Sequence, residues 1–254
     1  MNLAPARAGN ELIQPDATPK PGTAEPRRAH CQDPPSGESG NAAGSRPVMQ
    51  LEHKPSKVLI VGCSGSGKTQ YWTRYLLGSR ARLKFVFDHE GEFAGRLKFR
   101  PATTLEQLAT AAGRGWCVFD PARLYPGATP EAFAFFLDFA FTLSTQTGGR
   151  KLFACDELQA VTDTHTVSPE LACVLETGRR YGLDFAAIAQ QPNLVHNRVR
   201  NQATEVVTFQ QMDPRAVDWC AAVGFDPAAV RGLAPGQYLA RNLKTGGPAA
   251  GRVF

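Results

Sequence analysis

The sequence has no apolar run long enough to cross a membrane. Its longest apolar stretch, residues 132–143, is interrupted by Asp138 and is far shorter than the roughly 20 residues that a transmembrane helix needs. The N-terminus also lacks the basic segment followed by an apolar one that marks a secretory signal peptide. We therefore expect a soluble protein with no transmembrane segment of its own.

The sequence also lacks cysteines at the spacings that are typical of metal sites. The six cysteines form no Cys-x-x-Cys pair and show no metal-site spacing. This arrangement argues against a zinc site and suits a reducing compartment. We expect a cytoplasmic protein.

The first fifty residues contain no aromatic side chain and hold 8 of the 19 prolines. Such a segment buries too little surface to offset its ordering entropy, so we predict a disordered Pro/Ala/Gly-rich tail over residues 1–50. It fits a passive tail, a tether for a partner or, because Met49 stands just before the folded region, a misassigned start. The remaining residues, 51–254, are enough for one domain with a sizeable core.

The net charge of +5 belongs to this domain, since residues 1–50 carry five basic and five acidic side chains and residues 51–254 carry 23 and 18. The excess is modest. It is compatible with a polyanionic partner and equally with an ordinary basic surface.

Apolar runs and amphipathic segments alternate along the domain. The predicted strands are residues 57–62, 83–88, 115–120, 150–157, 183–189, 204–210 and 236–241, the last being the final strand of the chain. The predicted helices are residues 69–78, 103–113, 130–146, 168–180 and 213–224. This alternation predicts an α/β fold, with a mostly parallel sheet and helices on both faces.

The helix predicted at residues 130–146 is unusually rich in phenylalanine. Its aromatic residues are Phe133, Phe135, Phe136, Phe139 and Phe141. Their mixed spacing favours packing in the core over a face that stacks on DNA.

A glycine-rich loop between the first strand and the first helix fills the pattern G-x-x-x-x-G-K-[ST] completely. Its residues are Gly62, Cys63, Ser64, Gly65, Ser66, Gly67, Lys68 and Thr69. In such a phosphate loop the backbone amides surround phosphate oxygens, and the helix N-terminus adds its positive end. Lys68 would neutralise the β- and γ-phosphates, and the Thr69 hydroxyl would bind Mg²⁺. The motif predicts binding of a nucleoside triphosphate.

Two carboxylates, Asp156 and Glu157, end the strand at 150–157. We predict that Asp156 holds Mg²⁺ and that Glu157 activates the attacking water. The sequence has no Asn-Lys-x-Asp motif for reading guanine. The combination favours ATP hydrolysis coupled to mechanical work over a switch GTPase or a nucleotide kinase.

Polar residues also flank the strand at 183–189. Gln190 follows it, where an amide can contact the γ-phosphate or the lytic water. Arg179 and Arg180 precede it, at the other edge of the sheet. In a ring of subunits this position can insert an arginine into the neighbour's site; alternatively, the pair caps a helix C-terminus.

Five segments, in this order, carry a family resemblance: "GCSGSGKT", "FDHEGEF", "LFACDE", "GRRYGLDFAAIAQQPN" and "LAPGQYLAR". Over residues 55–242 the chain resembles the HerA/FtsK superfamily of DNA-translocating P-loop ATPases. The phosphate loop is generic. The specific matches are the segment 88–93, Arg179 with Gly182, Gln190 with Pro192, and the segment 233–239.

The resemblance implies an additional-strand, RecA-like P-loop ATPase that uses ATP and Mg²⁺, assembles as a homo-oligomer, a hexameric ring, and moves double-stranded DNA. Arg179 would be the residue that reaches the neighbouring site, with Arg180 as the alternative. A bare core without appended domains is most similar to the genome-packaging ATPases of tailless phages with an internal membrane and a double-jelly-roll capsid. Such a motor would dock on a capsid vertex or small membrane proteins, in the host cytoplasm or on the virion.

Three other functions remain open from the sequence. One is a plasmid or conjugative-element DNA-transfer ATPase. Another is a Zot-like ATPase of filamentous-phage morphogenesis, although Zot-like chains carry a transmembrane helix after the ATPase core. The third, a small-molecule kinase, would need an arginine-bearing lid that the sequence does not show.

Overall fold

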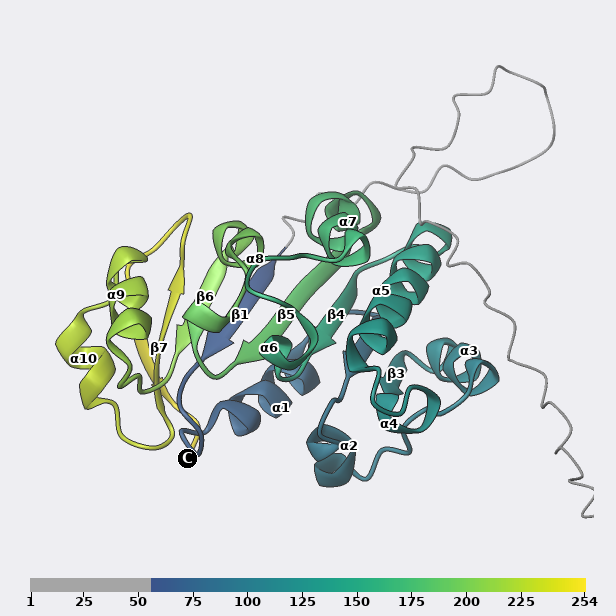
Figure 1. Ribbon diagram of the computed structural model, residues 1–254, viewed down its shortest axis with the longest axis horizontal. Coiled ribbons are helices and arrows are strands. Elements are labelled where there is room, and N and C mark those ends of the chain that lie inside the picture. Colours follow the sequence, from purple (N-terminus) through teal and green to yellow (C-terminus); the bar gives the residue numbers. More distant parts are fainter. Residues whose placement is uncertain (1–55) are drawn as a thin grey trace, which may run out of the picture. The chain divides into compact units, whose positions relative to one another are not determined.

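The computed structural model describes residues 56–254, which form a sheet of eight strands with helices on both faces (Figure 1). The tail predicted at residues 1–50 lies outside the described residues. The strands are β1 (Lys57–Val61), β2 (Leu83–Phe87), β3 (Trp116–Phe119), β4 (Lys151–Cys155), β5 (Leu183–Ala189), β6 (Glu205–Thr208), β7 (Gln237–Asn242) and β8 (Ala249–Arg252).

The helices connect consecutive strands. They are α1 (Lys68–Gly78), α2 (Glu92–Leu97), α3 (Leu105–Gly113), α4 (Pro121–Leu124), α5 (Thr129–Gln146), α6 (Leu158–Val161), α7 (Pro169–Thr177), α8 (Asn197–Gln202), α9 (Pro214–Ala222) and α10 (Pro227–Gly232), with short 3₁₀ turns η1 (Gly178–Tyr181) and η2 (Pro192–Leu194). Side chains of Thr104, Ser168, Asp213 and Asp226 cap the N-termini of α3, α7, α9 and α10. Within residues 56–254, no helix is both long and apolar enough to cross a membrane.

The strand order is β3-β2-β4-β5-β1-β6-β7-β8. Strands β1 to β6 are parallel, and β7 and β8 add an antiparallel edge. The predicted mostly parallel sheet is confirmed. Strand β5 lies between β1, which precedes the phosphate loop, and β4, which precedes the acidic pair. This is the additional strand that the family resemblance implies.

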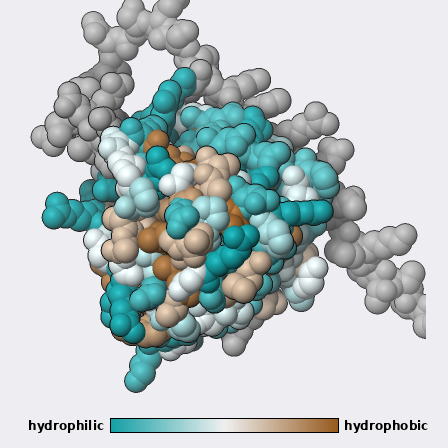
Figure 2. All heavy atoms as spheres, turned by 90° about the vertical axis from the view of Figure 1, so that its left-hand side faces the viewer, coloured by the Kyte–Doolittle hydropathy of each residue, from teal (hydrophilic) through white to brown (hydrophobic). Residues whose placement is uncertain are grey.

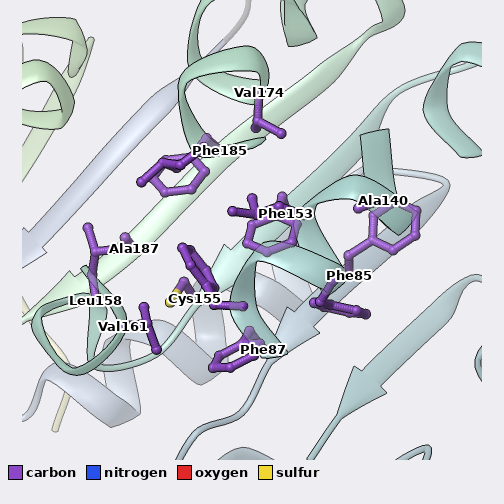
Figure 3. Close-up of a cluster of buried hydrophobic side chains, with 14 of the residues drawn as sticks. Phe85, Phe87, Ala140, Phe153, Cys155, Leu158, Val161, Val174, Phe185 and Ala187 are labelled. Atoms are coloured by element: carbon purple, nitrogen blue, oxygen red, sulfur yellow. The ribbon is translucent and has the colours of Figure 1, made fainter. Parts of the chain in front are cut away.

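Each face of the parallel sheet has its own core, because consecutive strand residues point to opposite faces. One core joins β2, β4 and β5 to α5, α6 and α7, and its side chains converge in Figure 3. Within it, Phe133 and Phe136 of α5 are buried and pack against Phe153 of β4. The phenylalanine-rich helix therefore packs in the core, as predicted. The opposite core brings Trp72 and Leu76 of α1 onto the other face.

Two predictions about the elements are wrong. The strand at 236–241 is not the last, because β8 follows and pairs with β7 antiparallel. The segment predicted as one helix over 168–180 is α7 up to Thr177, then the 3₁₀ turn η1, which Gly182 ends with a φ of 68°.

On the side that carries α9, α10 and β7, a small hydrophobic patch is surrounded by hydrophilic residues (Figure 2).

Candidate active site

The phosphate loop (residues 62–69) joins β1 to α1 at the carboxyl edge of the sheet. Its first two amides tie it to both neighbouring strands. The N–H of Gly62 donates to the carbonyl oxygen of Gln190, after β5, at 3.2 Å, and the N–H of Cys63 donates to that of Gln210, after β6, at 3.0 Å. Gly67 caps α1 with a φ of 104°, a conformation that favours glycine. The loop is thus anchored on both sides.

Two polar groups within the loop have the chemistry to hold an anion. The ammonium of Lys68 is largely buried and donates to the carbonyl oxygen of Cys63 at 2.9 Å. Burial lowers the pKa of Lys68, and the nearby charge of Glu157 opposes this shift. The hydroxyl of Ser66 is buried without a hydrogen-bond partner among the described residues. Because buried polar groups normally have partners, the Ser66 hydroxyl fits a phosphate oxygen, and the Lys68 ammonium has the charge to bind one at this helix N-terminus.

The acidic pair lies beside the loop. Asp156 is buried, and this burial, with the charges of Glu157 and Asp88, raises the pKa of Asp156 to about 7. The N–H of Glu157 donates to Oδ1 of Asp156 at 3.0 Å, and the Glu157 carboxylate accepts from the amide of Gln159. Glu157 has a φ of 48°, which costs energy for a residue with a side chain. Backbone strain and a raised carboxyl pKa are both typical of functional sites.

Two more carboxylates belong to this edge and were not among the predicted site residues. Asp88, which follows β2, is completely buried and accepts from the N–H groups of Phe93 at 3.2 Å and Ala94 at 2.8 Å, so it caps α2. The charge of Glu90 affects the pKa of both Lys68 and Asp156. The sequence signal that could have identified Asp88 is its position directly after a strand that runs parallel to β4.

Gln190 stands at the end of β5, and its side chain is exposed. Its carbonyl oxygen accepts two hydrogen bonds, from Gly62 N–H and from the side-chain amide of Gln211, both at 3.2 Å. Gln211 is only 1 % exposed. Sequence reasoning missed Gln211, because its role depends on β6 lying next to β1. The two glutamines connect the ends of β5 and β6 behind the phosphate loop.

Arg179 is not near these groups. It lies in η1, which precedes β5, and is exposed at the amino edge of the sheet. There its charge is the largest influence after burial that lowers the pKa of Lys57, the first residue of β1. The seven residues of β5 separate this edge from the phosphate loop by about 20 Å. An arginine side chain cannot bridge that distance within one chain.

The residues at the carboxyl edge fit a magnesium ion bound together with a nucleotide. No group of three or more His, Cys, Asp or Glu side chains that could hold a metal occurs in residues 56–254. Mg²⁺ in nucleotide sites, however, usually takes only one or two protein ligands and completes its shell with phosphates and water. Asp156, crowded by like charges, and Thr69, in the first turn of α1, have the required oxygen donors.

No protein-family model matches the sequence, and no curated protein matches it. Solved structures do match the fold. The genome packaging NTPase B204 from Sulfolobus turreted icosahedral virus 2, in complex with sulfate, superposes with a TM-score of 0.63 at 19% identity, covering 77% of this chain and 95% of that one. The same protein in complex with ATP-gammaS gives 0.62 at 18% identity, covering 78% and 98%.

This chain has the fold of a P-loop ATPase. A second likeness agrees: ATPases 2 and 3 of EssC from Geobacillus thermodenitrificans superpose with a TM-score of 0.52 at 17% identity, covering 74% of this chain and 37% of that one. The strand order, with β5 between β1 and β4, assigns the RecA-like, additional-strand type. The phosphate loop and the acidic pair occupy the carboxyl ends of parallel strands, where ligands bind in such folds.

Proposed function

We propose that this protein hydrolyses ATP and uses the energy to translocate double-stranded DNA. The observation that carries the proposal is the placement of Lys68 and Glu157. The phosphate loop and Glu157 lie at one edge of the sheet, where the charge of Glu157 acts on the pKa of Lys68. They follow β1 and β4, which are separated only by β5. This is the arrangement that hydrolysis of a bound triphosphate requires.

Each residue of the site has a chemical task in this reaction. Lys68 and the amides of the phosphate loop bind the β- and γ-phosphates. Glu157 accepts a proton from the attacking water, and Gln190 orients that water or the γ-phosphate. Asp156 and Thr69 would hold Mg²⁺, which neutralises the charge developing on the phosphates.

The position of Arg179 supports a ring. Its amino-edge location excludes a role at its own phosphate loop, whereas a head-to-tail neighbour can present that edge to the next subunit's nucleotide. An arginine supplied in this way stabilises the charge on the transferred phosphoryl group. We propose that the active site is completed between subunits of a homo-oligomeric ring.

The proposed substrate of the motor is DNA, and the proposed role is viral genome packaging. Both proposals rest on the structural likeness to the packaging NTPase B204 and on the sequence resemblance described above. The likeness covers nearly the whole B204 chain. A plasmid or conjugative DNA-transfer ATPase has the same core and stays the alternative.

The test is ATP turnover by the purified full chain with and without double-stranded DNA, beside electron microscopy of the same sample. We expect hydrolysis that DNA stimulates, and ring-shaped particles. Turnover that DNA leaves unchanged, in a protein that stays monomeric, would contradict the translocase proposal while leaving ATP hydrolysis in place.

A further inference from the structure

The sheet order determines on which side of the phosphate loop a nucleoside would lie. The groups proposed to act on the terminal phosphate, Glu157 and Gln190, follow β4 and β5, on one side of β1. A triphosphate that presents its terminal phosphate to that side leaves its nucleoside on the other, toward β6, β7 and β8. This inference rests on the proposed nucleotide site.

The hairpin of β7 and β8 contacts the loop on that second side. Gly236, just before β7, donates its N–H to the carbonyl oxygen of Ser66 at 2.9 Å, and its own carbonyl accepts from Val253 N–H at 2.9 Å. A Cβ placed on Gly67 would be 3.2 Å from both Cα of Gly236 and Cγ2 of Val253. Figure 1 accordingly shows the C end beside the start of α1. The hairpin therefore packs along one side of the phosphate loop.

Phe254 packs against Gly236 of this hairpin segment. Its ring carbons come within 2.7 to 3.0 Å of the point where a Cβ of Gly236 would be, so only glycine leaves room for the ring there. The φ of Gly236 is +82°, a second reason for glycine. Although one side of the ring covers Gly236, Phe254 is 56% exposed. An exposed aromatic ring thus lies next to the hairpin residue that contacts the loop.

The hairpin that precedes Phe254 packs against α1. Tyr238 of β7 packs edge-on against Tyr71 of α1, with ring centroids 4.8 Å apart, and also against Phe209 after β6, at 5.7 Å. Tyr71 in turn donates its N–H to the carbonyl oxygen of Gly67 at 3.1 Å. This aromatic cluster joins the hairpin to the first turn of α1, and Phe254 covers Gly236 at the start of that hairpin.

We propose that Phe254 stacks on the base of the bound nucleotide. Aromatic side chains stack on any base through its π-face, and a purine offers the larger surface. The contact therefore selects purine over pyrimidine nucleotides and does not separate adenine from guanine. Gly236 and Val253 act as positioning residues, because they set the ring beside the loop.

The experiment is calorimetric titration of the full chain with ADP, GDP, CDP and inorganic tripolyphosphate, which has the phosphates without a base. Phe254→Ala should bind ADP and GDP roughly tenfold more weakly than the wild type, the size expected for one lost stacking contact, and tripolyphosphate equally well. Leu105→Ala is the matched control, because Leu105 is also 56% exposed but lies in α3 at the far side of the sheet. It should change no affinity.

Phe254→Trp provides a second readout. It should keep the ADP affinity, and its added fluorescence, relative to the wild type, should be quenched by ADP but not by tripolyphosphate. Equal ADP affinity in Phe254→Ala and wild type would overturn the stacking proposal. So would an equal loss for tripolyphosphate, which would assign the ring to support of the loop. A wild type that binds neither ADP nor tripolyphosphate would instead refute the nucleotide site itself.

Discussion

The amide of Gly62 donates a hydrogen bond to the carbonyl oxygen of Gln190 at 3.2 Å. The first residue of the phosphate loop and the first residue after β5 are therefore joined through the backbone. The buried side chain of Gln211 donates to the same oxygen. In the proposed ATPase, any displacement of Gln190 on loss of the γ-phosphate acts directly on the phosphate loop and on the end of β6.

Replacing Lys68 with alanine removes the ammonium that donates to the carbonyl oxygen of Cys63 within the loop. We expect ATP to bind about 10- to 100-fold more weakly, since hydrogen bonds to charged groups contribute roughly 1.5–3 kcal/mol. Calorimetry with ATP and Mg²⁺ measures the change. Arg74→Ala, an exposed cation on the same helix, is the control and should bind normally. Unchanged affinity in Lys68→Ala would refute the assignment of the loop.

Glu157→Gln keeps the shape of the side chain but removes its negative charge. ATP should still bind, and turnover should fall by at least about 100-fold, the usual contribution of a general base. Steady-state phosphate release measures it. Glu131→Gln, an exposed glutamate of α5, should hydrolyse ATP at the wild-type rate. Turnover within a few-fold of wild type in Glu157→Gln would place water activation elsewhere.

Asp156 gives the protein a specific pH dependence. Its pKa is raised from 3.8 to about 7, so between these values the folded state binds more protons than the unfolded state. The free energy of unfolding without nucleotide should therefore decrease as pH rises from about 4 to 7 and level off above. Denaturant titrations at several pH values test this.

Asp156→Asn should remove that part of the decrease and be more stable than wild type at pH 8, with a smaller difference near pH 5. The matched control is Asp218→Asn, at an exposed position of α9, which should follow the wild-type profile. Parallel profiles for wild type and Asp156→Asn would show that Asp156 does not titrate in this range. In wild type, Mg²⁺-dependent ATP binding should strengthen from pH 6 to pH 8, as the carboxylate loses its proton.

DNA binding should be tolerant of sequence and should weaken steeply with salt. Residues 51–254 carry 23 basic and 18 acidic side chains, and contacts to phosphates release counterions. Fluorescence anisotropy with two unrelated duplexes, from 50 to 300 mM salt, gives the slope. A salt-insensitive footprint on one sequence would be the behaviour of a specific DNA-binding protein and would count against a translocase.

The main strands and the phosphate loop follow from local sequence. Runs such as residues 58–61 and 185–189 are apolar throughout, as buried parallel strands require. Strand β8 could not be predicted in this way. Its residues, Ala249–Arg252, have low strand propensity and mostly exposed side chains, and they form a strand because they pair with β7.

The residues of the candidate site likewise differ in whether the sequence alone predicts them. Lys68, Asp156 and Glu157 belong to contiguous motifs and are visible in the sequence. Asp88 opens the segment 88–93, but its place at the site, like that of Gln211, depends on the sheet order that brings its strand to the loop. The contact of Gly236 with Ser66 links positions 170 residues apart and has no local signature.

The central claim is that the active site is completed by Arg179 from a neighbouring subunit. The most direct measurement mixes two inactive variants. Arg179→Ala should bind ATP almost as well as wild type and hydrolyse it about 10³-fold more slowly, the lower end for an arginine acting in trans. Arg180→Ala, the adjacent control, should be affected much less. Lys68→Ala subunits should bind ATP poorly but retain Arg179.

Mixed assemblies of Arg179→Ala and Lys68→Ala subunits contain interfaces at which an intact phosphate loop meets an intact arginine. The account predicts that ATP turnover of the mixture exceeds that of either variant alone and passes through a maximum as the mixing ratio is varied. Turnover that stays at the level of the two variants at every ratio, with a lowered melting temperature for Arg179→Ala, would show instead that Arg179 stabilises its own subunit and would contradict a shared active site.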